Sequence, residues 1–214
     1  MSSNAVIDVK GLTIKFGRET VFTDISFTVN SGQKVVIEGR SGTGKSTLLK
    51  CLLGFILPDT GQIRFNSRIL NHQTVWDIRK HTAYLPQEPD LGSGTVRDIL
   101  ELPFTYQANL HKKKNLNKTE KLFERFFLSR DLLEKRISTL SGGQKQRVAL
   151  VSAVLLDRNV YFLDEPTSAL DALSRKAVMD FFTDSDSTVL WISHHHEICN
   201  PDEVIDLDHI RVKP

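Results

Sequence analysis

This chain of 214 residues has few cysteines and a small net charge. The two cysteines, Cys51 and Cys199, lie far apart, and nothing in the sequence points to an oxidising compartment. Cys51 lies in an apolar stretch, where a cysteine usually serves as a small buried hydrophobic residue. The formal net charge is only +2, which is too small to predict nucleic-acid binding, because that function needs a clustered basic face.

Long hydrophobic runs are also missing. The longest dense apolar run, residues 148–156, falls far short of the roughly 18–20 residues that span a bilayer. The first five residues have neither the basic region nor the apolar region of a signal peptide. The composition, 40% apolar and 25% charged, is that of an ordinary globular domain. We therefore expect one soluble domain without direct membrane insertion, which reaches any membrane through a partner.

A glycine-rich stretch is the most informative part of the sequence. It follows the apolar run 35–37 and precedes the helix-like run 48–53, which is the strand–loop–helix context of a phosphate-binding P-loop. The glycines let the backbone turn tightly, and the helix adds unpaired N–H groups and the positive end of its dipole. Lys45 is predicted to reach the β- and γ-phosphates, and the Ser46 hydroxyl to ligate Mg²⁺. The predicted triphosphate site comprises Gly39, Arg40, Ser41, Gly42, Thr43, Gly44, Lys45, Ser46 and Thr47.

Strand patterns surround this loop. Strands are predicted at 6–16, 21–29, 34–37, 62–65, 83–85, 160–163, 188–192 and 204–207. The second alternates apolar and polar residues, as a half-buried strand does. The continuous apolar runs 160–163 and 188–192 are typical of a parallel sheet covered on both faces. Helical patterns dominate from about 88 to 140, so we expect an α/β sheet wound around the P-loop, with a helical insert.

Three features of the insert lead to specific predictions. Thr95 and Asp98 have the spacing of a capping box that opens a helix. The basic run 112–114 is interpreted as a solvated helix end or loop. An apolar stripe at helical spacing is interpreted as core, and it consists of Leu122, Phe123, Phe126 and Phe127.

Two adjacent carboxylates follow the apolar run 160–163. Phosphoryl transfer depends on positioning and charge neutralisation more than on covalent chemistry. Asp164, at the end of the predicted strand, is suited to the Mg²⁺ shell. Glu165 is the candidate for the group that orients and activates the attacking water. Pro166 follows them, which favours a strand end with both carboxylates near the phosphates.

A second candidate phosphate site begins at Ser141. Ser141 can cap a helix, and Gln144 can return the bond as a capping box. Glycines in the first turn leave N–H groups open to an anion, and they cost a plain helix roughly 1 kcal/mol each. An ordinary capped helix is the simpler interpretation. A phosphate site here makes sense if it serves the nucleotide of another subunit, and its residues are Ser141, Gly142, Gly143 and Gln144.

Six motifs occur in one order along the chain. They are the loop 39–47, Gln87 after a strand, Leu-Ser-Gly-Gly-Gln at 140–144, Phe-Leu-Asp-Glu-Pro at 162–166, Ser-Ala-Leu-Asp at 168–171 and Ser-His at 193–194. Together they resemble the ATP-binding subunit of ABC transporters, over essentially the whole chain. The resemblance implies a P-loop NTPase with a RecA-like, mainly parallel core, an N-terminal antiparallel β subdomain and a helical insert subdomain. It implies one domain, 1–214, in which 1–87 and 141–214 form the ATP-binding core and 88–140 the helical subdomain.

The resemblance also implies cofactors and catalytic roles. The adenine of ATP would stack on Phe16, where the family more often has tyrosine. Gln87 would contact Mg²⁺ and the attacking water, and His194 would contact the γ-phosphate. Mg²⁺ would be held by Ser46, Gln87 and Asp164. The implied catalytic set is Lys45, Gln87, Glu165 and His194.

Members of this family work as pairs, so the resemblance implies an ATP-dependent homodimer that binds two ATP molecules head to tail. Ser141, Gly143 and Gln144 would contact the γ-phosphate of the ATP on the opposite subunit, and Asp171 would lie at the seam. The insert 88–140 would contact a separate transmembrane permease. The chain would then be cytoplasmic and peripheral on the inner face of the cell membrane, with no nucleic-acid partner.

Finer assignments have several alternatives. Segments 122–126, 132–135 and 189–192 resemble the bacterial FetA/YbbL-like ATPases, a likeness that implies metal export, with iron as the metal. A soluble ABC-type ATPase acting on nucleic acid or ribosomes would usually carry two such domains, coiled-coil inserts or basic arms. A nucleotide-sensing module without transport is disfavoured by the complete set Asp164, Glu165 and His194. The motifs themselves encode neither the transported substrate nor the direction of transport.

Overall fold

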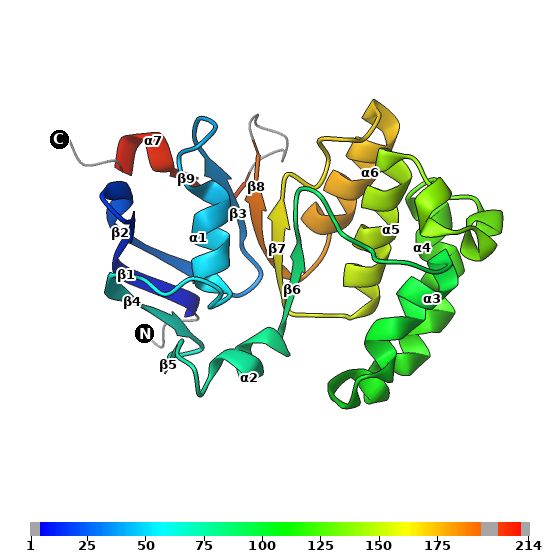
Figure 1. Ribbon diagram of the computed structural model, residues 1–214, viewed down its shortest axis with the longest axis horizontal. Helices are drawn as coiled ribbons and strands as arrows, with labels where there is room; N and C mark the ends of the chain where they lie inside the picture. The colour runs from blue at the N-terminus through cyan, green and yellow to red at the C-terminus, as the bar shows by residue number, and fades with distance from the viewer. Residues whose placement is uncertain (1–4, 194–200, 211–214) are drawn as a thin grey trace.

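The computed structural model describes residues 5–193 and 201–210, and a parallel sheet lies at its centre (Figure 1). The strand order of this sheet is β6 (Thr82–Leu85), β7 (Val160–Asp164), β8 (Thr188–Ile192), β3 (Lys34–Glu38) and β9 (Glu203–Asp206). All neighbouring strands are parallel. Every residue of β7 and β8 is buried, as their continuous apolar runs predicted.

An antiparallel sheet, built from the N-terminal part of the chain, covers one side of the molecule (Figure 1). Its order is β2 (Glu19–Asn30), β1 (Ala5–Phe16), β4 (Thr60–Phe65) and β5 (Arg68–Ile69). Helix α1 (Lys45–Leu52) shares an apolar cluster with Ile7 of β1 and Ile37 of β3. Strand β5 and the helix α2 (Val75–Arg79) were not predicted, because elements of 2 and 5 residues are too short to show a periodicity.

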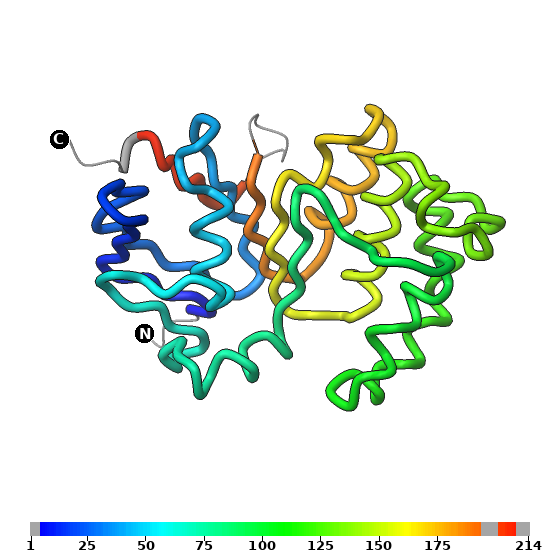
Figure 2. Tube along the Cα trace, in the orientation of Figure 1, coloured from blue at the N-terminus to red at the C-terminus, as the bar shows by residue number. Residues whose placement is uncertain are grey.

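The face of the parallel sheet opposite α1 is covered by α5 (Gly142–Leu155) and α6 (Ala172–Thr183), with the insert beyond them (Figures 1 and 2). The alternation of side chains along β7 separates the two faces: Tyr161 and Leu163 belong to the cluster that includes α5 and the insert. Phe162, between them, belongs to the cluster that includes α1. Helices α1 and α5 therefore lie on opposite faces of the sheet.

The insert consists of short helical segments. They are α3 (Val96–Glu101), the 3₁₀ segments η1 (Leu102–Thr105) and η2 (Gln107–Lys118), α4 (Thr119–Arg125), η3 (Arg130–Glu134) and η4 (Ile137–Thr139). The predicted capping box at the start of α3 is confirmed, since the Asp98 N–H donates to Thr95 Oγ1 at 3.2 Å and the Asp98 carboxylate accepts from the Thr95 N–H at 2.8 Å. In the part of the chain that the structure describes, no helix is long and apolar enough to cross a membrane.

The apolar stripe of the insert is only partly core. Leu122, Phe123 and Phe126 are buried in the same cluster as α5. The prediction is wrong for Phe127, whose side chain is 58% exposed. Helix α4 ends at Arg125, and Phe127 has a φ of +53°, so its side chain leaves the helical face that the spacing assumed.

The basic run 112–114 is also only partly solvated. Lys113 and Lys114 are exposed, as expected. The prediction is wrong for Lys112, whose Nζ donates to the carbonyls of Leu156 and Asp157 at the end of α5. Asn115 Nδ2 donates to the Leu155 carbonyl at 2.9 Å, so polar side chains of η2 satisfy the last carbonyls of α5.

Candidate nucleotide-binding site

The glycine-rich loop connects the carboxyl end of β3 to α1, as predicted. Gly44, the residue before α1, has a φ of +96°, and a Cβ there would lie 2.4 Å from Val21 Cγ1. Gly39 has a φ of +143°, and a Cβ there would lie 2.8 Å from Thr43 Oγ1. Both positions therefore require glycine, for the backbone conformation and for space.

The start of α1 is suited to an anion. Its N-cap residue is Gly44, so no side chain caps the first N–H groups, and no acidic residue occupies the first turn. Lys45 is buried and folds back over the loop, where its Nζ donates to the Gly39 carbonyl at 2.7 Å and to the Arg40 carbonyl at 3.1 Å. Burial lowers the pKa of Lys45, while Glu165, Asp164 and Asp208 act to raise this pKa.

The Asp164 carboxylate lies beside the start of α1, at the end of β7. It is 3% exposed, and burial raises its pKa, whereas a hydrogen bond from the Ser46 hydroxyl acts to lower this pKa. Its Oδ1 is buried without a hydrogen-bond partner among the described residues. A buried carboxylate oxygen that lacks a donor, next to a hydroxyl, matches the hard oxygen ligands that Mg²⁺ prefers. The residues present therefore fit this ion.

Glu165 and Gln87 meet where β6 and β7 end. Gln87 Nε2 donates to Glu165 Oε2 at 2.9 Å, across 78 residues of sequence. Glu165 has a φ of +47°, and its N–H donates to the Ile192 carbonyl of β8 at 3.1 Å, which fixes the turn beyond the strand. The parallel sheet thus brings Lys45, Ser46, Gln87, Asp164 and Glu165 to one edge, as the sequence predicted.

The segment Ser141–Gln144 forms the predicted capping box, but its two glycines have different surroundings. The Gln144 N–H donates to Ser141 Oγ at 3.3 Å, and the Ser141 N–H donates to Gln144 Oε1 at 3.0 Å. A Cβ on Gly143 would lie 2.8 Å from the Ala169 carbonyl oxygen, so packing within the chain already requires this glycine. A Cβ on Gly142 would meet no atom within 4 Å. Packing within the chain therefore explains the glycine at position 143. Only at position 142 does an external anion remain the reason for a glycine.

Asp171 and Arg147 connect the insert to the core. Asp171 caps α6: its carboxylate accepts from the Ser174 N–H and the Ser174 hydroxyl, each at 2.9 Å, and these bonds lower the pKa of Asp171. Arg147 of α5 donates through Nη1 to Ser174 Oγ at 3.0 Å and to the carbonyls of Phe126 and Phe127, where α4 ends. No role was predicted for Arg147, although a cation directly before the apolar run 148–156 was a possible signal.

Phe16 and His194 complete the predicted set. Phe16 is 54% exposed and ends β1, one turn away from the β2 residue Val21, which packs on Gly44 of the loop. His194 lies outside the described residues. The Ser193 N–H before it donates to the Ile37 carbonyl at 3.4 Å, so the chain leaves β8 at the edge that carries the loop.

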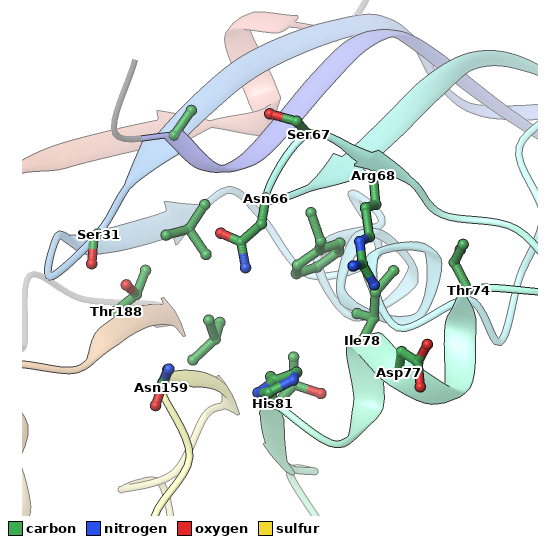
Figure 3. A pocket seen from close by; sticks show the side chains of 15 residues that line it. Ser31, Asn66, Ser67, Arg68, Thr74, Asp77, Ile78, His81, Asn159 and Thr188 are labelled. Atoms are coloured by element: carbon green, nitrogen blue, oxygen red, sulfur yellow. The ribbon is translucent and has the colours of Figure 1, made fainter. Parts of the chain in front are cut away.

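A cavity of about 670 Å³ lies at the opposite edge of the sheet (Figure 3). Its lining includes Thr82, Val160 and Thr188, the first residues of β6, β7 and β8. Asn66 and His81 also line it and are labelled in the view. The loop, the carboxylates and Gln87 all lie at the carboxyl ends of the strands, which is where open α/β sheets bind their ligands. This cavity is therefore separate from the candidate nucleotide site.

Comparison with known proteins decides the family. The family model described as ABC transporter matches residues 22–168. This chain belongs to the ABC transporter family of ATPases. The energy-coupling factor transporter ATP-binding protein EcfA1 of Lactiplantibacillus plantarum is 36% identical over 199 residues, which cover 88% of this chain and 70% of that protein. The mesentericin-Y105 transport/processing ATP-binding protein MesD of Leuconostoc mesenteroides is 34% identical over 91% of this ABC ATPase chain, which spans only 28% of MesD.

The solved structures agree on the fold. An ATP-binding cassette determined as a dimer in a post-hydrolysis state, bound to ADP and Pi, superposes with a TM-score of 0.80. The alignment covers 97% of each chain at 23% identity. The predicted fold class, a P-loop NTPase fold with a mainly parallel sheet, an antiparallel β part and a helical part, is confirmed.

Proposed function

We propose that this ABC ATPase hydrolyses ATP between two head-to-tail copies of the chain and powers a separate membrane permease. One observation carries the proposal: the nucleotide machinery is divided between two faces of the sheet. The loop and α1 lie on one face, and Ser141–Gln144 opens α5 on the other. Within one chain the two cannot enclose one nucleotide, whereas the open side of Gly142 can approach the nucleotide of a second copy.

At the phosphates, the loop residues bind and Lys45 neutralises charge. The loop N–H groups and the start of α1 hold the phosphate oxygens, and the Lys45 ammonium exchanges its carbonyl partners for them. Ser46, Asp164 and Gln87 would hold Mg²⁺, which would supply further charge neutralisation. The exposed ring of Phe16 stacks on adenine.

Glu165 is the proposed general base. Its carboxylate takes a proton of the attacking water while the water oxygen bonds to the γ-phosphorus. The bond from the γ-phosphorus to the bridging oxygen breaks in the same step, and ADP and inorganic phosphate are released. Gln87, hydrogen-bonded to Glu165, orients the same water through its amide. His194 contacts the γ-phosphate. Ser141, Gly143 and Gln144 of the second copy complete the γ-phosphate shell, and Asp171 lies at the seam.

The permease is proposed to dock on the helical subdomain, residues 88–140, with 1–87 and 141–214 as the ATP-binding core. Several large apolar side chains of this subdomain are exposed, namely Leu102, Tyr106, Leu110 and Phe127. A groove of about 200 Å³ lies between the 86–91 segment and α5. Phe127 is coupled to the core, because Arg147 donates both to its carbonyl and to the Ser174 hydroxyl, which in turn donates to the Asp171 carboxylate. With the permease docked there, the subunit is proposed to be peripheral on the inner face of the cell membrane.

As cargo we propose a metal ion, iron, moved outward. The proposal is supported by the likeness of segments 122–126, 132–135 and 189–192 to the FetA/YbbL-like ATPases. Iron accumulation in cells that lack the chain, restored to normal by the wild type and not by Lys45→Ala, is the expected result. Unchanged iron levels would exclude this cargo and leave the ATPase assignment intact.

The test of the main proposal is reconstitution with the permease that co-purifies with this chain. ATP hydrolysis is expected to require Lys45 and to rise when the permease is present. ATP should convert the chain from monomer to dimer in gel filtration. Stimulation by RNA or ribosomes instead would favour a soluble ABC ATPase, and ATP binding without hydrolysis, even with the permease, would favour a nucleotide sensor.

A further inference from the structure

The C-terminal helix α7 (Leu207–Ile210) reaches the P-loop. Asp208 Oδ2 accepts from the backbone N–H of Arg40 at 2.9 Å, and Asp208 Oδ1 accepts from Arg40 Nε at 3.3 Å. These two residues are 168 positions apart in the sequence. A side chain outside the six motifs thus holds the second residue of the loop.

The carbonyl oxygen of Arg40 accepts several of the hydrogen bonds that shape the loop. The Arg40 carbonyl accepts from the Thr43 N–H at 3.2 Å and from Thr43 Oγ1 at 2.9 Å. It also accepts from Lys45 Nζ at 3.1 Å. Asp208 therefore fixes the N–H of Arg40, while the carbonyl of the same residue bonds Thr43 at the turn and the Lys45 ammonium.

The position of Asp208 is itself fixed by the fold. Strand β9 pairs with β3 in a register that sets Asp206 opposite Glu38, so α7 begins where the loop begins. Leu207 is 1% exposed, and a Cβ on Gly39 would lie 3.5 Å from Leu207 Cβ, so the helix packs against the loop backbone. The Asp208 N–H donates to Asp206 Oδ1 at 2.8 Å. The carboxylate is thus held in place before any nucleotide arrives.

We propose that Asp208 is a positioning residue that keeps the P-loop preformed for the β-phosphate of a bound nucleotide. The hydrogen bond from the Arg40 backbone N–H to Asp208, rather than the ion pair with the Arg40 side chain, holds the loop in this conformation. The side chain of Arg40 is 82% exposed, and ion pairs at such exposure contribute little. Ligand binding costs less free energy when the loop is already ordered. Loss of this order therefore weakens nucleotide affinity. The proposal rests on nucleotide binding at this loop, and on neither the dimer nor the permease.

The test compares Asp208→Ala with Asp208→Asn, using the full chain and titrations with ADP and with ATP. Asp208→Ala is expected to raise both Kd values about tenfold, which corresponds to about 1.4 kcal/mol and to the loss of one charge-assisted hydrogen bond. KM for ATP should rise similarly, with kcat within about twofold of wild type. Asp208→Asn should change Kd less than about threefold, because the amide oxygen still accepts the Arg40 N–H.

Glu203→Ala is the matched control, since Glu203 is an acidic residue at the other end of β9. This variant should bind ADP like wild type, and thermal unfolding should show all three variants folded. An unchanged ADP Kd in Asp208→Ala would overturn the proposal, as would an Asn variant as weak as the Ala variant. A fall in kcat at constant KM would also overturn it. Failure of permease stimulation with an intact Asp208 effect would count against the transport function alone.

Discussion

Replacement of Glu165 by glutamine isolates the chemical step from nucleotide binding. The substitution removes the negative charge and the proton-accepting oxygen but keeps the size and shape of the side chain. The amide oxygen of the substituted side chain can still accept the 2.9 Å hydrogen bond that Gln87 Nε2 donates to Glu165 Oε2 in the wild type. The turn should also persist, because the main-chain N–H at position 165 bonds the Ile192 carbonyl.

The substitution is expected to affect the reaction barrier, the stability of the fold and nucleotide affinity by different amounts. A general base contributes about 10²–10⁴ in rate, so the barrier should rise by about 3–5 kcal/mol. One charge-assisted hydrogen bond becomes a neutral one, which costs the fold at most about 1 kcal/mol. Nucleotide affinity should rise, because the variant has one less carboxylate beside Asp164 near the triphosphate. Glu165 and Asp164 both act to raise the pKa of Lys45, which places them close to the Lys45 amine.

The assay follows phosphate release and oligomeric state in parallel. Glu165→Gln with ATP and Mg²⁺ should release phosphate at least about 100-fold more slowly than wild type, and should elute as a stable dimer. With ADP it should elute as a monomer, because no γ-phosphate is available to the opposite Ser141–Gln144. Glu203→Gln, the same substitution outside the site, should behave as wild type in both measurements.

Three results would refute this reasoning. Wild-type turnover in Glu165→Gln would show that Glu165 is not the base. Loss of ATP binding together with turnover would show that Glu165 maintains the site rather than activates water. A dimer that forms equally with ADP would contradict the role of the γ-phosphate in closing the two copies.

The remaining predictions concern the glycines, Asp164 and Lys112. Gly142→Ala should raise the free energy of unfolding by about 0.5–1 kcal/mol through helix propensity, since its Cβ meets no atom, yet should reduce ATP-dependent dimerisation. Gly143→Ala should lower both stability and activity, because its Cβ would lie 2.8 Å from the Ala169 carbonyl, so equal melting temperatures for the two variants would contradict the packing argument. Asp164→Asn should raise the melting temperature of the nucleotide-free protein by a few degrees at pH 7, while abolishing Mg²⁺-dependent hydrolysis. Burial raises the folded-state pKa of Asp164, so ionisation destabilises the fold as pH rises above the ordinary carboxyl range, and the difference between variant and wild type should vanish in acid, where both side chains are neutral. Lys112→Met should cost about 1–2 kcal/mol in urea unfolding, because two carbonyls at the end of α5 lose their donor, whereas Lys113→Met, at an exposed neighbour, should cost almost nothing.

Local patterns in the sequence sufficed wherever a feature depends on neighbouring residues. The P-loop, the capping boxes at Thr95 and Ser141, and the buried runs of β7 and β8 are of this kind. Their physical causes act over a few residues: a glycine that permits positive φ, a side chain that bonds the N–H three positions on, and a period that reports burial.

Local patterns failed where a side chain's surroundings come from elsewhere. Phe127 fitted the helical spacing of the stripe, but α4 ends two residues before it. Lys112 appeared to be one of three solvated lysines, but the end of α5 lies beside it and offers two carbonyls. Gly143 appeared to be retained for a ligand, but the Ala169 carbonyl already occupies the space of a side chain.

The amino-acid sequence by itself therefore determined the P-loop and the strand-end carboxylates, and with them the prediction of a triphosphate site, because these features are local. Only the tertiary structure decided which distant groups meet. The strand order brings Gln87 to Glu165, the pairing of β9 with β3 brings Asp208 to Arg40, and the alternation along β7 places α5 on the face opposite α1. These contacts depend on sheet order and register, which no short window of sequence contains.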